Sequence, residues 1–203
     1  MMDINFIDYF VYNAIVTLTM FFVSFIIVVL NRISKGWFNK HLFSTQRGCW
    51  YNPFTYLRLF THILGHKDWK HFSNNYLKIL LLGPLIEEKY GSINFLIMIL
   101  VTAFVTGLVN LCIKNTNLKG SSSIAFMLIV LSAFVNISGD KIPLTLVLII
   151  GFYIIDEIKD LRKKDSVAHY GHLAGAICGL IFGFIFLNGD PWQIVMNFIN
   201  NFF

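Results

Sequence analysis

The sequence predicts an all-α polytopic membrane protein. Hydrophobic residues make up 56% of its 203 residues and charged residues only 13%, whereas soluble domains carry about 25% charged residues. Apolar runs close to the ~20 residues that a membrane span requires recur along the chain. The three cysteines are scattered, so they predict neither a disulfide framework nor a paired metal-binding motif. We expect a single membrane domain over residues 1–203, and the sequence shows no ligand set for a metal.

The expected helical spans follow from these apolar runs. The first is predicted at about residues 7–30. It is interpreted as a retained span because no basic segment precedes it and no small-residue cleavage pattern follows it. The later spans are predicted at about residues 71–86, 95–113, 122–135, 143–155 and 170–187.

The long connection over residues 31–70 is rich in aromatic side chains, including Trp37, Trp50 and Tyr51. Such amphipathic rings favour the boundary between lipid and water. We therefore expect this loop to be interfacial and partly embedded in the membrane.

Two later segments each allow two interpretations. In residues 190–203, Asp190 and Pro191 suit the start of a helix that lies on the membrane surface, and the alternative is a frayed tail. The charged run DEIKDLRKKD over residues 156–165 is either a lid or a solvated loop.

A first polar cluster lies at the start of the second predicted span. His71 and Asn75 are four residues apart, so they share one helix face. His62 and His66 have the same spacing, which raises a zinc site, but Ile63 stands where the glutamate of HExxH would be. The alternative for each histidine is an ordinary interfacial side chain.

A second cluster is the run Gly120-Ser121-Ser122-Ser123 before the fourth span. It is not the nucleophile elbow of the α/β-hydrolases, because Ile124 stands where that motif needs glycine. A serine at a helix start can be a simple N-cap. Three serines in a row are more than a cap requires.

A third cluster is a stripe of glycines at every fourth position of the last span, at residues 171, 175, 179 and 183. Small residues at this spacing allow another helix to approach closely, so packing alone would explain them. His172 stands beside the stripe and is carried to wherever it docks. If it docks on the serines, the histidine can take a hydroxyl proton, while His71 and Asn75 could supply donors for an oxyanion.

In these motifs the sequence resembles the rhomboid family of intramembrane serine proteases. HKDWKHFSNN over residues 66–75, GSS over 120–122 and GHLAGAICG over 171–179 resemble the family's second-helix, nucleophile and general-base motifs, in the family's order. RLFTHILGH over 58–66 and LIEEKYGS over 85–92 resemble its first-loop segment and its Glu-x-x-x-Gly turn. The resemblance extends from about residue 58 to residue 183, and it implies a six-helix rhomboid-like bundle whose core covers about residues 58–187.

The resemblance implies a role for each matching residue. Ser122 would be the nucleophile and His172 the base of a Ser–His dyad that needs no acidic third member. Phe126 would hold the imidazole, and His71 and Asn75, with the Ser122 backbone N–H, would form the oxyanion hole next to Gly120. The remaining matches would be structural: Arg58, His62, His66, Glu87, Gly175 and Gly179.

The implied activity is hydrolysis of a peptide bond in or near the transmembrane helix of a membrane-protein substrate, and the resemblance implies no cofactor. The partners would be that substrate and the lipid bilayer, with no nucleic acid, and the oligomeric state is not predicted. The membrane would be a bacterial-type plasma membrane. The sequence departs from the family pattern at Ser123, where glycine is usual, and at Leu57, where tryptophan is usual.

Three alternatives accompany this interpretation. Lys and Arg cluster in the loops nearest Ser122, which by the positive-inside rule would face the cytoplasm, whereas the resemblance implies the reverse. Embedding of the first loop, with snorkelling of its charges, would reconcile the two. The alternative functions are a catalytically inactive rhomboid-like protein that binds transmembrane helices, and a small channel or transporter.

Overall fold

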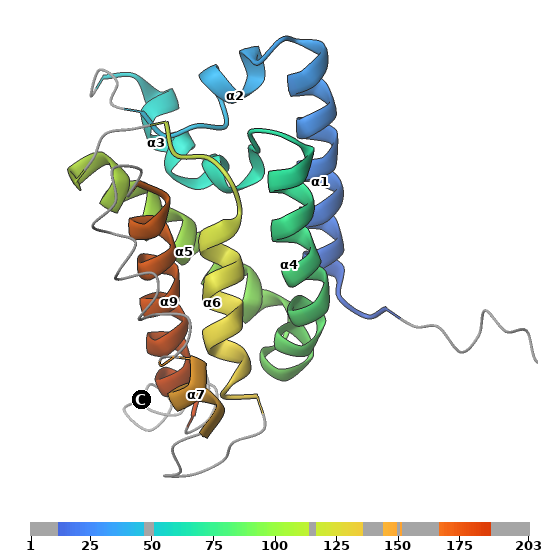
Figure 1. The fold of residues 1–203 in the computed structure, drawn as a ribbon, viewed down its shortest axis with the longest axis vertical. Helices are drawn as coiled ribbons and strands as arrows, with labels where there is room; N and C mark the ends of the chain where they lie inside the picture. The colour runs from blue at the N-terminus through green and yellow to red at the C-terminus, as the bar shows by residue number, and fades with distance from the viewer. Residues whose placement is uncertain are drawn as a thin grey trace, which may run out of the picture.

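The computed structural model describes residues 12–46, 51–113, 117–135, 144–149, 151 and 167–187, and this part of the chain is mostly helical (Figure 1). It holds no β-strand, only an isolated bridge between Thr45 and Leu118. The longer helices are α1 (Ile15–Ile33), α4 (Trp69–Tyr90), α5 (Ser92–Ile113), α6 (Ser122–Ser132) and α9 (Val167–Ile185). The all-α class predicted from composition is therefore confirmed for the described residues.

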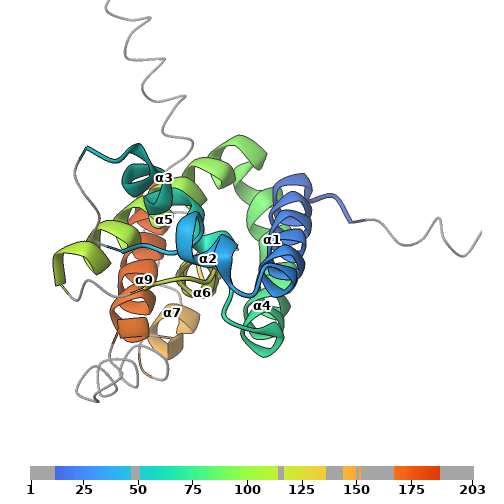
Figure 2. The same ribbon diagram turned by 90° about the horizontal axis from the view of Figure 1, so that it is seen from above.

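Helix α6 is the centre of the molecule. It stands between α4 and α9, with α5 behind it and α1 on the outer side of α4, as the two views show (Figures 1 and 2). Side chains around its whole circumference are buried, among them Ile124, Met127, Leu128 and Leu131, each 0% exposed. A helix that is apolar on every side is stable only when other helices surround it.

Among the described residues, two helices, α1 and α5, are long and apolar enough to cross a membrane by length and composition. Their outer faces carry exposed large hydrophobic side chains, such as Phe22 and Ile26 on α1 and Leu96 and Leu100 on α5. Exposed apolar surface of this kind suits contact with lipid rather than water.

Helix α1 begins at Ile15, later than the predicted residue 7, and ends at Ile33 rather than residue 30. Its start is set by Glu87, whose carboxylate accepts the backbone N–H groups of Val16 and Thr17 at 2.9 and 3.1 Å and the Thr17 hydroxyl at 3.0 Å. The first N–H groups of a helix have no partner within the helix and favour a negative charge. A residue from another helix thus fixes this boundary.

Helix α4 is longer at both ends than the predicted 71–86. Asp68 caps its start by accepting the His71 backbone N–H at 2.8 Å. The helix ends at Tyr90, before Gly91, which has a φ of +80°. The sequence did not predict this helix end, because the charged residues near Tyr90 interrupt the apolar pattern.

The connection from α1 to α4 contains short helices rather than a simple loop. These are α2 (Trp37–His41), α3 (Pro53–Thr61) and the 3₁₀ turn η2 (His62–Leu64). Asn52 caps α3 by accepting the Phe54 N–H, and Pro53 occupies its first turn. Both α2 and α3 lie at the end of the bundle where α6 begins (Figure 1).

The remaining predicted spans match in place but differ in extent. α5 begins three residues before the predicted residue 95, and α6 ends at Ser132 rather than 135. α9 begins at Val167 rather than 170. α7 (Leu144–Ile149) falls within the span predicted at 143–155. The segments 156–165 and 190–203 lie outside the described residues.

Candidate active site

The turn into α6 is shaped by Gly120, which has a φ of +122°. Its backbone N–H donates to the His62 carbonyl at 3.0 Å. A Cβ at this position would lie 2.6 Å from Cε1 of His71 and 3.6 Å from Nδ2 of Asn75. Glycine is required here both by the left-handed backbone and by the close approach of His71.

The three serines that follow differ in their surroundings. Ser121 is 0% exposed and Ser123 is 4% exposed. Ser122, the first residue of α6, is only partly buried. Ser121 occupies the N-cap position, yet its side chain makes no capping hydrogen bond, so the simple capping interpretation does not hold for it.

Ser121 belongs to a buried pair with His66. The His66 Nε2 atom lies 3.0 Å from the Ser121 hydroxyl oxygen and 3.4 Å from the Ser121 backbone nitrogen. His66 Nδ1 donates to the Leu64 carbonyl at 3.3 Å, which leaves Nε2 to accept from Ser121. This pair resembles a Ser–His dyad in distance, but full burial of its serine removes it from any substrate.

Burial lowers the pKa of His66 to about 3, with a further contribution from His71, and burial lowers the pKa of His62 to about 4. Both imidazoles are therefore neutral near pH 7. Nδ1 of His62 donates to the Arg58 carbonyl at 3.2 Å, and its Nε2 lies 3.3 Å from the Thr106 hydroxyl. The nitrogens of these two imidazoles each bond to a different protein group, and these hydrogen bonds hold the loop.

Arg58 itself is buried and donates from Nε to the Phe54 carbonyl at 2.9 Å, within α3. Glu87 lies at the far end of α4 from the serines and binds α1, as described above. Its Oε1 also accepts the Ser92 hydroxyl at 2.7 Å. The structural roles that the resemblance implies for Arg58 and Glu87 stay predictions.

The glycine stripe of α9 packs directly on α6. A Cβ at Gly175 would overlap the Ser123 carbonyl, and a Cβ at Gly179 would lie 2.5 Å from the Met127 carbonyl oxygen. At Gly183 it would overlap the Phe134 ring. Gly171 has more room, with Leu118 as its nearest neighbour at 3.7 Å. The stripe brings the two backbones together from Ser123 to Phe134.

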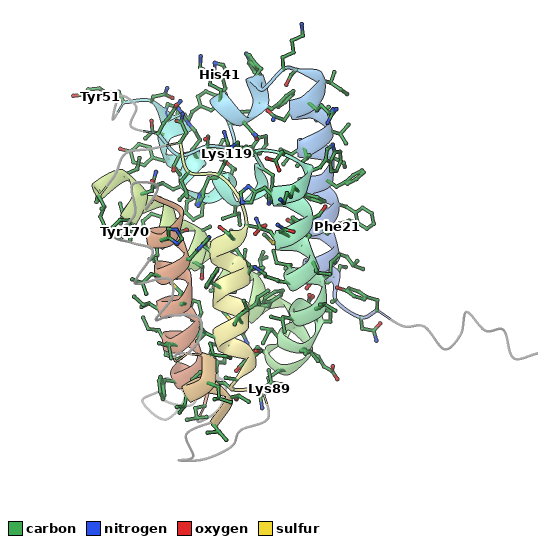
Figure 3. The ribbon with its side chains drawn as sticks, viewed as in Figure 1. Phe21, His41, Tyr51, Lys89, Lys119 and Tyr170 are labelled. Atoms are coloured by element: carbon green, nitrogen blue, oxygen red, sulfur yellow. The ribbon has the colours of Figure 1, made fainter. Side chains whose placement is uncertain are left out.

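This packing places His172 beside the first turn of α6. Its ring is stacked on that of Phe126, with centroids 4.4 Å apart and an interplanar angle of 10°. Phe126 is one helical turn after Ser122, so the imidazole lies on the face of α6 that also carries the serine. Figure 3 shows Lys119, which precedes Gly120, and Tyr170 at the same end of the bundle, with Lys89 at the other end.

Asn75 faces the Gly120 turn from α4. It is 4% exposed, and its Nδ2 is buried without a hydrogen-bond partner among the described residues. Buried amide groups are almost always paired, so an unpartnered one calls for an explanation. Together with His71, it offers N–H donors next to the first residues of α6.

Several supporting residues could not be recognised from the sequence. Thr45 donates its backbone N–H to the Leu118 carbonyl at 2.9 Å, and its hydroxyl accepts from Asn110 at 2.8 Å. Asn39 donates to the His66 carbonyl at 2.8 Å. These contacts fix the segment that leads into Gly120, but isolated Thr and Asn residues give no signal of their partners.

Comparison with known proteins identifies the family. A model of the rhomboid domain matches residues 53–199. Rhomboid-like protein 11, chloroplastic, of Arabidopsis thaliana is 26% identical over 132 residues, which cover 57% of this chain and 47% of that protein. The match thus extends over about half the length of this curated relative.

Proposed function

The chain belongs to the rhomboid family, and on this premise we propose that it is an intramembrane serine protease that cleaves a peptide bond in or near a substrate's transmembrane helix. Rhomboid family proteins are membrane-embedded, and α1 and α5 have the length and composition of membrane spans. The proposed nucleophile is Ser122 and the proposed base is His172.

The observation that carries the proposal is the convergence of three elements on the start of α6. α6 supplies a partly accessible serine, α9 supplies a histidine stacked one turn away, and α4 supplies an unpartnered amide donor. A nucleophile, a base and preorganised donors are the parts that acyl transfer requires.

In the proposed reaction, the Ser122 hydroxyl oxygen attacks the scissile carbonyl carbon while His172 takes the hydroxyl proton. The carbonyl oxygen becomes an oxyanion, which the Asn75 amide, His71 and the Ser122 backbone N–H would stabilise. The imidazolium then gives its proton to the leaving amine as the C–N bond breaks. Water repeats the sequence on the acyl-enzyme, with His172 again as base, and frees Ser122 and a carboxylic acid.

Phe126 has a defined part in this scheme. Its stacking contact holds the His172 ring in one plane, which a carboxylate does in the familiar triad. The buried pair of Ser121 and His66 would hold the turn that presents Ser122. Neither of these residues would exchange protons with the substrate.

The first test is covalent labelling of the detergent-solubilised protein with a fluorophosphonate probe, which an activated serine attacks with loss of fluoride. We expect labelling of wild type and of Ser121→Ala, and none of Ser122→Ala or His172→Ala. Cleavage of a model single-span substrate should follow the same pattern. Labelling that persists in Ser122→Ala would refute the assignment of the nucleophile.

The same experiment addresses the alternative of an inactive helix-binding protein. That alternative predicts no labelling of the folded wild-type protein together with retained binding of a single-span peptide. Circular dichroism and size-exclusion chromatography of each variant show whether it is folded. A folded, unlabelled wild type would therefore move the assignment from a protease to a binding protein.

The orientation belongs to the proposal as well. We infer that the end of the bundle bearing Lys119 faces away from the cytoplasm and the end bearing Lys89 faces it (Figure 3). A single cysteine placed at either position, in a protein whose own cysteines are replaced by serine, can be labelled in intact cells with an impermeant maleimide. Labelling only at position 119 is expected, and labelling only at position 89 would reverse the orientation.

A further inference from the structure

Helix α4 carries a lysine at its centre, an unusual place for a charge. Lys78 is the tenth of the 22 residues from Trp69 to Tyr90, and its side chain is partly buried. Charged residues at the middle of a span are disfavoured by lipid, and those that persist usually face a polar cavity and serve a function. The sequence motifs discussed above do not include this residue.

Lys78 lies on the face of α4 that lines the candidate site. It follows Asn75 by three residues and His71 by seven, and these spacings repeat on one side of a helix. Its Nζ atom is 5.8 Å from the centroid of the Phe126 ring. The same ring is stacked on His172, so Lys78 and the proposed base both contact Phe126.

Within the described residues, the carboxylates of α4 are too distant to pair with this ammonium. Asp68 precedes Lys78 by ten residues and Glu88 follows it by ten, which is about 15 Å along the axis in either direction. Glu87 is engaged with the start of α1. The described contact of Lys78 is the aromatic ring, which leaves the charge available to an incoming anion.

The depth of Lys78 relative to the nucleophile restricts what it can reach. Phe126 lies one turn, about 5 Å, further into the bundle than Ser122. An extended substrate advances about 3.3 Å per residue, so one turn corresponds to about two residues. A side chain about two residues from the scissile bond, on the side that leads into the membrane, would therefore come near the ammonium.

We propose that Lys78 forms a subsite for a substrate carboxylate, an Asp or Glu side chain about two residues from the scissile bond on the membrane side. The inference rests on the proposed function, because it takes Ser122 as the point of attack. A carboxylate in a transmembrane helix is itself disfavoured by lipid. Such a substrate gains on leaving the bilayer for a site that offers a positive charge.

The test measures binding rather than cleavage, in the Ser122→Ala protein. The probes are synthetic single-span peptides with a small residue at the cleavage position and Glu, Gln or Lys two residues beyond it. Fluorescence anisotropy in detergent micelles gives their Kd values. We expect the Glu peptide to bind about tenfold more tightly than the Gln peptide, in the range of one charge-assisted hydrogen bond.

Three further substitutions identify the source of this preference. Lys78→Met should abolish it, Lys78→Arg should retain it, and Lys78→Glu should favour the Lys peptide over the Glu peptide. Lys89→Met is the matched control, because Lys89 is exposed at the far end of the same helix and should leave the preference intact. Reversal in Lys78→Glu requires a folded protein, so it excludes simple unfolding.

The outcomes separate this inference from the proposed function. Equal binding of the Glu and Gln peptides, or an unchanged preference in Lys78→Met, overturns the subsite and leaves the protease intact. Absence of binding by any peptide overturns both. A Lys78-dependent preference, combined with a wild-type protein that neither cleaves nor reacts with the probe, upholds the subsite and refutes the protease.

Discussion

Two helix contacts on opposite sides of the molecule hold the candidate site together, and they are built in different ways (Figure 1). α9 meets α6 through glycines, with main chain almost touching main chain at Gly175 and Gly179. α1 meets α4 through side chains: the Tyr76 hydroxyl donates to the Met20 carbonyl at 3.0 Å, and Glu87 binds the start of α1. Aromatic rings fill the space between these two anchors, as Phe21 does against Phe72 and Tyr76.

The two contacts differ in how precisely each can place its functional groups. A contact between backbones has no side chain that can rearrange, so the distance from α9 to α6 tolerates little change. A contact made by several side chains can lose one of them and keep the rest. We therefore expect one substitution in the α6–α9 contact, which positions His172, to disrupt that contact completely. One substitution in the α1–α4 contact should reduce its stability only in part.

The largest effect should come from Gly175→Val. The new side chain would overlap the Ser123 backbone, so the two helices must separate. We expect a loss of about 3 kcal/mol or more in the free energy of unfolding, together with loss of fluorophosphonate labelling. Thermal unfolding in detergent and gel fluorescence measure the two effects.

Gly171→Ala is the matched control on the same stripe, because its new Cβ would make an ordinary contact with Leu118 at 3.7 Å. It should label and unfold like wild type. Wild-type labelling of Gly175→Val would show that the close packing of α9 does not position His172.

A smaller effect is expected from Glu87→Ala on the other side. It removes a charge from the start of α1 and leaves the N–H groups of Val16 and Thr17 without their acceptor. We expect about 2 kcal/mol of destabilisation, while labelling of Ser122 persists. The exposed neighbour Glu88→Ala should change neither quantity, and a loss of labelling in folded Glu87→Ala would contradict the graded behaviour of this side.

Lowering the pH should reduce the free energy of unfolding through His62 and His66, which lie in the loop between α3 and α4. The pKa of His66 is about 3 and that of His62 about 4 in the fold, both below the ordinary 6.5. The unfolded chain therefore takes up more protons as the pH falls below about 6.5, and each histidine costs about 1 kcal/mol over the first full pH unit of that fall. This contribution is complete above that pH and is lost progressively toward pH 4 and below.

The measurement is unfolding between about pH 7 and pH 5, where most carboxylates remain ionised. His66→Gln should reduce the slope of stability against pH, because it removes the buried imidazole whose pKa is lowered. A slope that is unchanged in His66→Gln would show that burial does not lower the pKa of this imidazole in the fold.

The smallest effect should come from Tyr76→Phe. It removes the hydroxyl that donates to the Met20 carbonyl and lies 2.6 Å from the Ser24 hydroxyl oxygen, but it keeps the ring in its aromatic cluster. We expect a loss of about 1 kcal/mol with labelling preserved. Tyr51→Phe, at a site 94% exposed, provides the control. Loss of labelling in Tyr76→Phe would mean that α4 is as sensitive as α9.

The same contrast explains how far sequence could predict the structure. The glycine spacing of α9 is a local pattern, and it correctly indicated a close helix contact. The face shared by His71 and Asn75 is local too. By contrast, the start of α1 depends on Glu87, 71 residues away from Val16, so no local pattern could give it.

The supporting polar contacts were beyond prediction for a related reason. Asn110 and Thr45 lie 65 residues apart, and each is an isolated polar residue in its own segment. Lys78 left a weak signal, its spacing from Asn75 on one helix face. Its proximity to Phe126 depends on how α4 packs against α6, and the sequence does not specify that geometry.

The unpartnered amide of Asn75 has a consequence for the evolution of this protein. A buried donor without an acceptor lowers the stability of the folded protein, and an apolar side chain at this position would relieve that penalty. In a laboratory library selected for thermal stability alone, asparagine at position 75 should therefore be replaced by apolar residues. Retention of asparagine in a library selected for substrate turnover would show that function maintains this residue despite its cost in stability.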